Sequence, residues 1–122
     1  MKRYKGVKKT RKPLIITSNI STVPAEGTYI IQYASFMGSG SLTYDNAGLM
    51  ALNFLSKLGP SEIFVAGMDG YTDMSQLDAN RDVSDSDVYS VTEFNSQMRK
   101  EIGNLRKKTV ITFITPSLYE EE

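Results

Sequence analysis

The sequence contains no cysteine, no histidine and no tryptophan among its 122 residues. Without cysteine the chain cannot form a disulfide framework or a thiolate metal site, which is typical of proteins from a reducing compartment. Without histidine it lacks the commonest general acid–base of enzymes and the commonest ligand of transition metals. Ser-His catalysis and histidine-based zinc sites are therefore excluded, and a bound metal would have to be a hard cation on oxygen ligands.

A long hydrophobic run is also missing. No apolar stretch approaches the roughly 18 residues that a membrane span requires. The basic start of the chain is followed only by the short apolar stretch PLIITSNI, which makes a poor signal peptide. We therefore expect a soluble, cytoplasmic protein, and its length suits a single core.

The charges balance overall, with 14 basic and 14 acidic residues, but they are unevenly placed. Seven basic residues fall in positions 1–12, and seven acidic ones fall in 69–93, where Arg81 is the only cation. Such asymmetry can indicate contact with nucleic acid or phosphate, but a solvated basic arm at 1–12 and a solvated loop explain it more simply. The arm lacks interleaved aromatic residues, so we do not expect nucleic-acid binding. Residues 120–122 form an acidic tail.

The remaining sequence alternates between strand and helix patterns. Short runs of β-branched and aromatic residues predict four strands, at 13–18, 28–36, 62–66 and 109–114. Apolar side chains recurring every three or four residues predict two helices, at about 44–58 and 91–107. The last five elements make two strand–helix–strand units, which normally cross over right-handed into a parallel sheet.

The predicted helices carry end signals. A side-chain oxygen of Thr43 or Asp45 can accept from the free N–H groups of the first helix, and Gly59-Pro60 ends that helix. The segment Ser90-Val91-Thr92-Glu93 matches a capping box at the start of the second helix.

We therefore predict a Rossmann-like layered α/β fold with a mostly parallel sheet, in a single domain at 13–119. Four strands and two helices cover such a sheet poorly, although parallel sheets are normally buried on both faces. The fold is thus expected to be incomplete in this chain. Either the chain is the C-terminal half of a larger domain, or a partner covers the sheet, and self-association is expected.

Two loops lie where open α/β sheets bind ligands, beyond the carboxyl ends of strands and at helix N-termini. The candidate ligand-binding residues are Gly38, Ser39, Gly40, Ser41, Asp45 and Asn46 in the first loop, and Gly67, Asp69, Gly70 and Tyr71 in the second. If the loops meet, they would form a pocket for a phosphate- or nucleotide-bearing ligand.

Neither loop is diagnostic by itself. The first is no G-x-G-x-x-G fingerprint, and no Gly-Lys-Ser/Thr follows it as in a P-loop, so its glycines can serve geometry alone. Asp69 stands near two glycines that would fix the direction of its carboxylate, but a turn-capping aspartate explains it equally well. Spacing assigns no pair of carboxylates to acid and base roles, so no catalytic residue and no cofactor is predicted.

The segment DNAGLMALNFLSKLGPSEIFVAGMDGYTD, residues 45–73, resembles a known motif. It is similar to the Rossmann-like C-terminal domain of bacterial aldolase-like proteins of the DRE-TIM metallolyase group (4-hydroxy-2-oxovalerate aldolase-like), which occur in surface-polysaccharide contexts. More distantly it resembles the second half of bacterial α-2,3-sialyltransferases that use a CMP-sugar. The positions that match the motif are Asp45, Asn46, Gly48, Gly67, Asp69 and Gly70.

The resemblance extends to Arg3-Tyr4 and to the ending FITPSLY, and so covers nearly the whole chain, while Ala47 and Met68 depart from the motif's serine and Phe or Ile. The lyase barrel with its metal and the sialyltransferase-type histidine have no counterpart here. The resemblance thus implies a non-catalytic accessory domain that binds a nucleotide-sugar or another phosphorylated ligand for an aldolase-like parent protein. Alternatives are a structural or oligomerisation domain, and a sugar-nucleotide-dependent glycosyltransferase with Asp69 or another carboxylate as its base.

Overall fold

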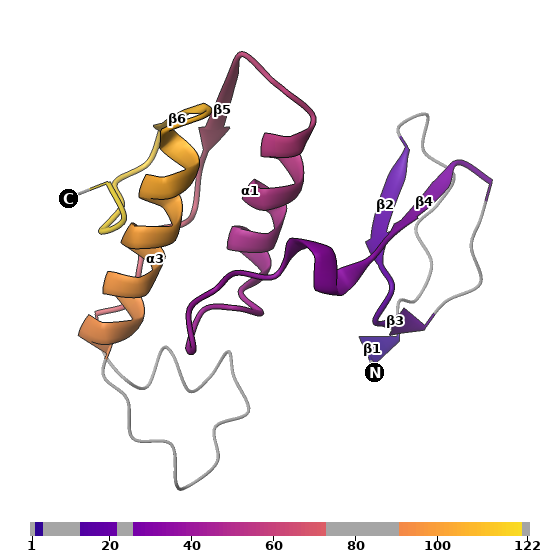
Figure 1. The fold of residues 1–122 in the computed structure, drawn as a ribbon, viewed down its shortest axis with the longest axis horizontal. Helices are drawn as coiled ribbons and strands as arrows, with labels where there is room; N and C mark the ends of the chain where they lie inside the picture. Colours follow the sequence, from indigo (N-terminus) through magenta and orange to yellow (C-terminus); the bar gives the residue numbers. More distant parts are fainter. Residues whose placement is uncertain (1, 4–12, 22–25, 73–90, 121–122) are drawn as a thin grey trace, which may run out of the picture. The chain divides into compact units, whose positions relative to one another are not determined.

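The computed structural model describes residues 2–3, 13–21, 26–72 and 91–120 (Figure 1). The chain divides into two compact units, Met1–Phe36 and Met37–Glu122. Both units contain strands paired in parallel, and the second also contains two α-helices. The predicted α/β class is thus confirmed. None of the described helices is long and apolar enough to cross a membrane.

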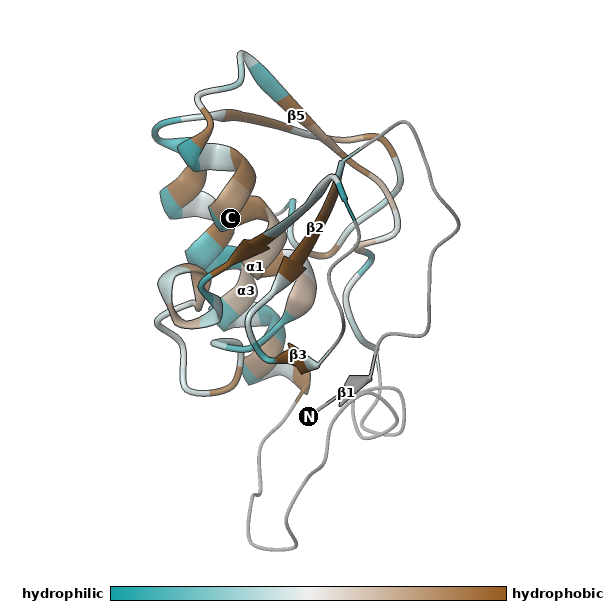
Figure 2. Cartoon of the chain, turned by 90° about the vertical axis from the view of Figure 1, so that its right-hand side faces the viewer, coloured by the Kyte–Doolittle hydropathy of each residue, from teal (hydrophilic) through white to brown (hydrophobic). Residues whose placement is uncertain are grey.

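The first unit is built from two short parallel pairs. Strand β2 (Leu14–Thr17) pairs with β4 (Thr28–Ile31), and β1 (Lys2–Arg3) pairs with β3 (Ile20–Ser21). Strand β2 is hydrophobic along most of its length (Figure 2), yet only its Ile16 is buried. The sequence predicts β2 and the start of β4, but it does not predict β1 or β3, whose two-residue length leaves no pattern to recognise.

Strand β4 is shorter than the predicted strand at 28–36. The Tyr33 amide donates to the Ser18 hydroxyl at 3.0 Å, and the Ser35 amide donates to the Gln32 carbonyl at 3.1 Å. These bonds turn the chain into a 3-10 helix, η1 (Tyr33–Phe36), directly after the strand. The aromatic residues there favour a strand by propensity, but these two hydrogen bonds hold the chain in the 3-10 turn instead.

The second unit contains a strand–helix–strand motif preceded by a helix. Its elements are α1 (Ala47–Lys57), β5 (Glu62–Val65), α3 (Val91–Arg106) and β6 (Val110–Phe113). Strands β5 and β6 pair in parallel, as predicted for the unit with α3 between them. The described strands form three two-stranded sheets, whereas the sequence predicts one sheet, so Rossmann-like layering stays a prediction.

The cap of α1 differs from the prediction. Asn46 is the N-cap, and its side-chain oxygen accepts from the Leu49 amide at 3.0 Å. The prediction of Thr43 or Asp45 is therefore wrong. A hydrogen-bonded turn precedes the helix, with the Asn46 amide donating to the Thr43 carbonyl at 3.0 Å, and this turn delays the start of the helix to Ala47.

The predicted helix ends agree better with the structure. Gly59 adopts a φ of +69° directly after α1, a left-handed conformation that glycine takes without steric cost. Helix α3 ends at Arg106, one residue before the predicted end. Ser90 of the predicted capping box and most of the acidic loop at 71–89 lie outside the described residues.

One hydrophobic core holds the second unit together. Both helices contribute to it, and the alternating side chains of β5 and β6 meet them from one face of the strand pair. Its buried members are Leu49, Leu52, Ile63, Val65, Phe94, Met98, Ile102, Ile111 and Tyr119. The opposite face of the strand pair leaves Phe64 64% exposed and Val110 57% exposed.

Replacing Ile102 by alanine is expected to destabilise the protein strongly. The Ile102 side chain is fully buried in the core, so the substitution leaves a cavity and costs about 2–5 kcal/mol. The matched control is Leu58→Ala, because Leu58 is 65% exposed and its truncation should change the free energy of unfolding by less than about 0.5 kcal/mol. Urea unfolding measures both, and equal midpoints would contradict the assigned core.

Candidate functional site

The glycine–serine loop is attached to α3 by one carboxylate. Oε1 of Glu101 accepts from the Ser39 amide at 2.7 Å, from the Gly40 amide at 3.0 Å and from the Ser39 hydroxyl. Successive backbone N–H groups that converge on one point form an anion-binding concavity. The loop therefore has the geometry of an oxyanion site, and the anion that it holds is a side chain of the same protein.

Gln97 holds the other half of this loop. Its Oε1 accepts from the Leu42 amide at 2.9 Å, and its Nε2 donates to the Ser41 hydroxyl at 3.1 Å. Gln97 and Glu101 are four residues apart and therefore share one face of α3. A Cβ atom at position 40 would lie 2.5 Å from the Gln97 Oε1, so only glycine allows the loop to approach the helix this closely.

The loop also contains a buried hydroxyl without a partner. Thr43 is fully buried, and its Oγ1 is the only buried side-chain oxygen or nitrogen in the described part of the chain that makes no hydrogen bond. An unsatisfied buried hydroxyl costs about 1–3 kcal/mol. A rearrangement of the loop that gave this oxygen a donor would recover that cost.

The second candidate loop is attached to the C-terminal segment. The Gly67 amide donates to the Thr115 hydroxyl at 2.9 Å, and the Asp69 carbonyl accepts from the Leu118 amide at 2.8 Å. Gly70 has a φ of +92° and lies against Leu118, so both its conformation and its lack of a side chain suit this position. Backbone atoms hold this loop, and the Asp69 side chain is exposed.

Helix α3 fixes the last residue of the second loop. The buried Asn95 accepts from the Tyr71 amide at 3.3 Å and donates to the Tyr71 carbonyl at 2.8 Å. The rings of Tyr71 and Phe94 meet edge to face with their centroids 5.4 Å apart. Both candidate loops are therefore positioned by side chains of the same helix.

The structure brings the two loops together beside the first turn of α1. The Met68 side chain packs so closely on Gly48 that a Cβ atom there would lie 2.8 Å from the Met68 Cε and 3.3 Å from the Asn46 Oδ1. Helices α1 and α3 begin at the same end of the unit, toward which β5 runs (Figure 1). The junction of these loops, residues 38–46 and 67–71, is called the rim below.

The polar groups of the rim are mostly engaged. Glu101 and Gln97 use the amides of the first loop, and the Asn46 side chain caps its own helix. The exposed charged side chains are the carboxylates of Asp45 and Asp69, which suit hydroxyl donors better than phosphate. In the described residues, no group of three or more carboxylates is arranged to hold a metal ion.

The sequence pattern does not identify the residues on α3 that position the rim. Gln97 and Glu101 look like ordinary solvated positions of an amphipathic helix, and nothing in their spacing indicates a loop partner. Asn95 does leave a signal, because it is a polar residue beside Phe94 and near Met98, on the edge of the apolar stripe. A buried polar residue at such a place needs a specific partner, here the Tyr71 backbone.

Compared with protein-family models, with curated proteins and with solved structures, the chain shows no significant match in any of the three. The geometry of the site is therefore the basis on which its function is proposed.

Replacing Glu101 by alanine is expected to release the glycine–serine loop from α3. The variant loses an ionised acceptor of three hydrogen bonds, so the free energy of unfolding should fall by about 1.5–3 kcal/mol. Hydrogen exchange at the Ser39 and Gly40 amides should accelerate. The control is Lys100→Ala, at an exposed neighbouring position on α3, and equal exchange in both variants would contradict the attachment.

Proposed function

We propose that the chain is a non-catalytic binding module with Rossmann-like layering. It binds a nucleotide-sugar or another phosphorylated ligand as an accessory domain of an aldolase-like parent protein. The observation that carries this proposal is the convergence of the Ser39 and Gly40 amides on one anionic oxygen at the rim. Open α/β sheets usually bind such ligands beyond the carboxyl ends of strands and at helix N-termini, and here the loop that follows β5 meets the N-terminus of α1.

The ligand would replace the Glu101 carboxylate. A phosphate group presents several strong acceptor oxygens, so it can take over the Ser39 and Gly40 amides that Glu101 now occupies. Sugar hydroxyls of the same ligand would then donate to the exposed carboxylates of Asp45 and Asp69. The unpartnered Thr43 hydroxyl lies beside Gly40 and is available to a rearranged loop.

Removing the negative charge of Glu101 is expected to strengthen ligand binding. The variant Glu101→Gln keeps a side-chain oxygen near the loop, but neutral hydrogen bonds are about half as strong as charge-assisted ones. If the contact of residue 101 with the loop amides is weakened by about 1 kcal/mol, the ligand that displaces it should bind roughly fivefold more tightly. Titration with CMP, UDP and their sugars, followed by amide shifts, should perturb residues 38–46 and 67–71 in the wild type and at lower concentration in the variant.

The control for this titration is Glu26→Gln, which makes the same change of charge at an exposed position of the first unit. Its affinity should equal that of the wild type. Unchanged spectra at millimolar ligand in both the wild type and Glu101→Gln would refute the proposal.

A second candidate function is self-assembly through the open face of the β5–β6 pair. Phe64, Val110 and Ile114 are 57–64% exposed, although parallel strands are normally covered on both faces. This apolar surface favours a second copy of the chain as its cover.

Sedimentation tests the assembly function. The wild type should form a concentration-dependent dimer in the micromolar range, and Phe64→Lys should remain monomeric because it places a charge in the apolar surface. Leu58→Lys is the matched control, since Leu58 is 65% exposed and is the C-cap of α1, outside the β5–β6 pair. A wild-type monomer at all micromolar concentrations would exclude assembly through this face.

A further inference from the structure

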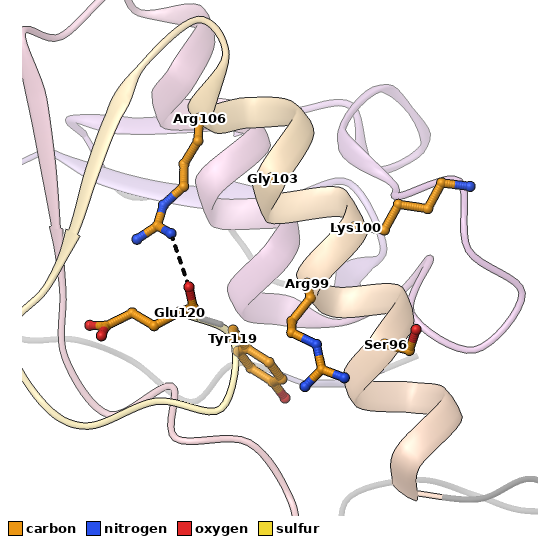
Figure 3. Close-up of a pocket in the computed structure, with 7 residues that line it drawn as sticks. All are labelled: Ser96, Arg99, Lys100, Gly103, Arg106, Tyr119 and Glu120. Atoms are coloured by element: carbon orange, nitrogen blue, oxygen red, sulfur yellow. Dashed lines mark hydrogen bonds between the residues drawn. The ribbon is translucent and has the colours of Figure 1, made fainter. Parts of the chain in front are cut away.

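A second face of α3 borders a hollow whose lining residues are not part of the rim. The hollow has a volume of about 390 Å³ and lies between α3 and the segment at 119–120 (Figure 3). The α3 residues Ser96, Arg99, Gly103 and Arg106 recur at spacings of three and four, so they line one side of it together. Its volume falls in the range of small-molecule sites.

Neutral acceptors hold the two arginines of the hollow in place. The Arg106 guanidinium donates to the Ile111 carbonyl at 3.1 Å and to the Glu120 carbonyl at 3.5 Å, and it lies 5.2 Å from the centre of the Phe113 ring. Arg99 donates to the Leu118 carbonyl at 3.2 Å. Carbonyl oxygens and a ring carry no net charge, so both guanidinium groups are positioned without an ion pair to any residue that the structure describes.

The lining has an excess of positive charge. Among the lining residues that the structure describes, Lys100 adds a third cation and Glu120 is the only carboxylate, which gives this described lining a net charge of two. In Figure 3 the Glu120 carboxylate extends away from Arg99 and passes below the Arg106 guanidinium, and the Lys100 ammonium points away from both guanidinium groups. Among the residues that the structure describes, Lys100 makes no ion pair or hydrogen bond with its side chain.

Two further residues fit a site for an anion. The Tyr119 hydroxyl is protonated at neutral pH, as in any tyrosine, and can donate a hydrogen bond. Burial and the nearby Tyr71 raise the pKa of Tyr119 further above its ordinary value. Gly103 lies inside α3, where glycine is destabilising relative to alanine. A Cβ atom there would meet nothing within 4 Å, so packing does not require this glycine, and its small size leaves the hollow open.

We propose that this hollow is a binding site for a phosphate group, either inorganic phosphate or the phosphate of a small phosphorylated molecule. A phosphate monoester carries a charge close to −2 at neutral pH, which matches the net charge of the lining. Guanidinium groups are planar and bind phosphate oxygens through paired N–H donors. The site involves other residues than the rim, so it stands independently of the proposed function.

The test is an amide-shift titration of the full chain with inorganic phosphate and, in a second arm, with CMP. Sodium chloride at equal ionic strength corrects for screening. Phosphate should perturb residues 96–106 and 118–120 with saturation in the millimolar range. Tighter binding of CMP at these residues would identify a phosphorylated molecule as the ligand, and equal or weaker binding would identify free phosphate.

Two substitutions at exposed positions test phosphate binding without disturbing the fold. Lys100→Ala should weaken phosphate binding about fivefold, because it removes one of the three positive charges of the described lining at an exposed, flexible side chain. Gly103→Leu should abolish binding by filling the hollow, while its higher helix propensity maintains α3. The control Lys108→Ala removes the same charge just beyond α3 and should bind like the wild type.

The site would be overturned by shifts no larger than those caused by sodium chloride, by equal weakening in Lys100→Ala and Lys108→Ala, or by unchanged binding in Gly103→Leu. Shifts confined to residues 38–46 and 67–71 would also reject the hollow while supporting the rim, so the two proposals are tested separately.

Discussion

The burial of one stripe of α3 is the interaction on which the second unit depends. Phe94, Met98 and Ile102 are almost completely removed from water, and they fix the rotation of the helix about its axis. Once this rotation is set, Gln97 and Glu101 face the glycine–serine loop, and Arg99 and Arg106 face the C-terminal segment. A single helix thereby positions the rim on one side and the basic hollow on another.

The sequence predicts those elements that have a strong periodic pattern. The apolar spacing along α3 and the β-branched runs of β5 and β6 locate these elements to within one residue at each end. The predicted N-cap of α1 was wrong. Thr43 and Asn46 are both acceptable N-cap residues, and a hydrogen-bonded turn before the helix decides between them. Propensity carries no information about such a turn.

The candidate site was predictable in its loops but not in its partners. Glycines mark the positions where the chain turns sharply, and both marked loops do meet at the start of α1. The groups that complete the site come from distant parts of the chain, since the Ser39 amide bonds Glu101 and the Gly67 amide bonds Thr115. No local pattern encodes these pairings, because they depend on how the helix and the strands pack.

The attachment of the second loop to Thr115 and Leu118 has a consequence for the order of events during synthesis. The parallel pairing of β5 with β6 joins Glu62 to Val110, so it requires that the ribosome has already released the whole of α3 and β6. The rim needs still later residues, because its second loop is bonded to positions 115 and 118. Helix α1 can form early during synthesis. Its buried residues become covered only when β5, α3 and β6 have been synthesised, because these elements supply the rest of the core.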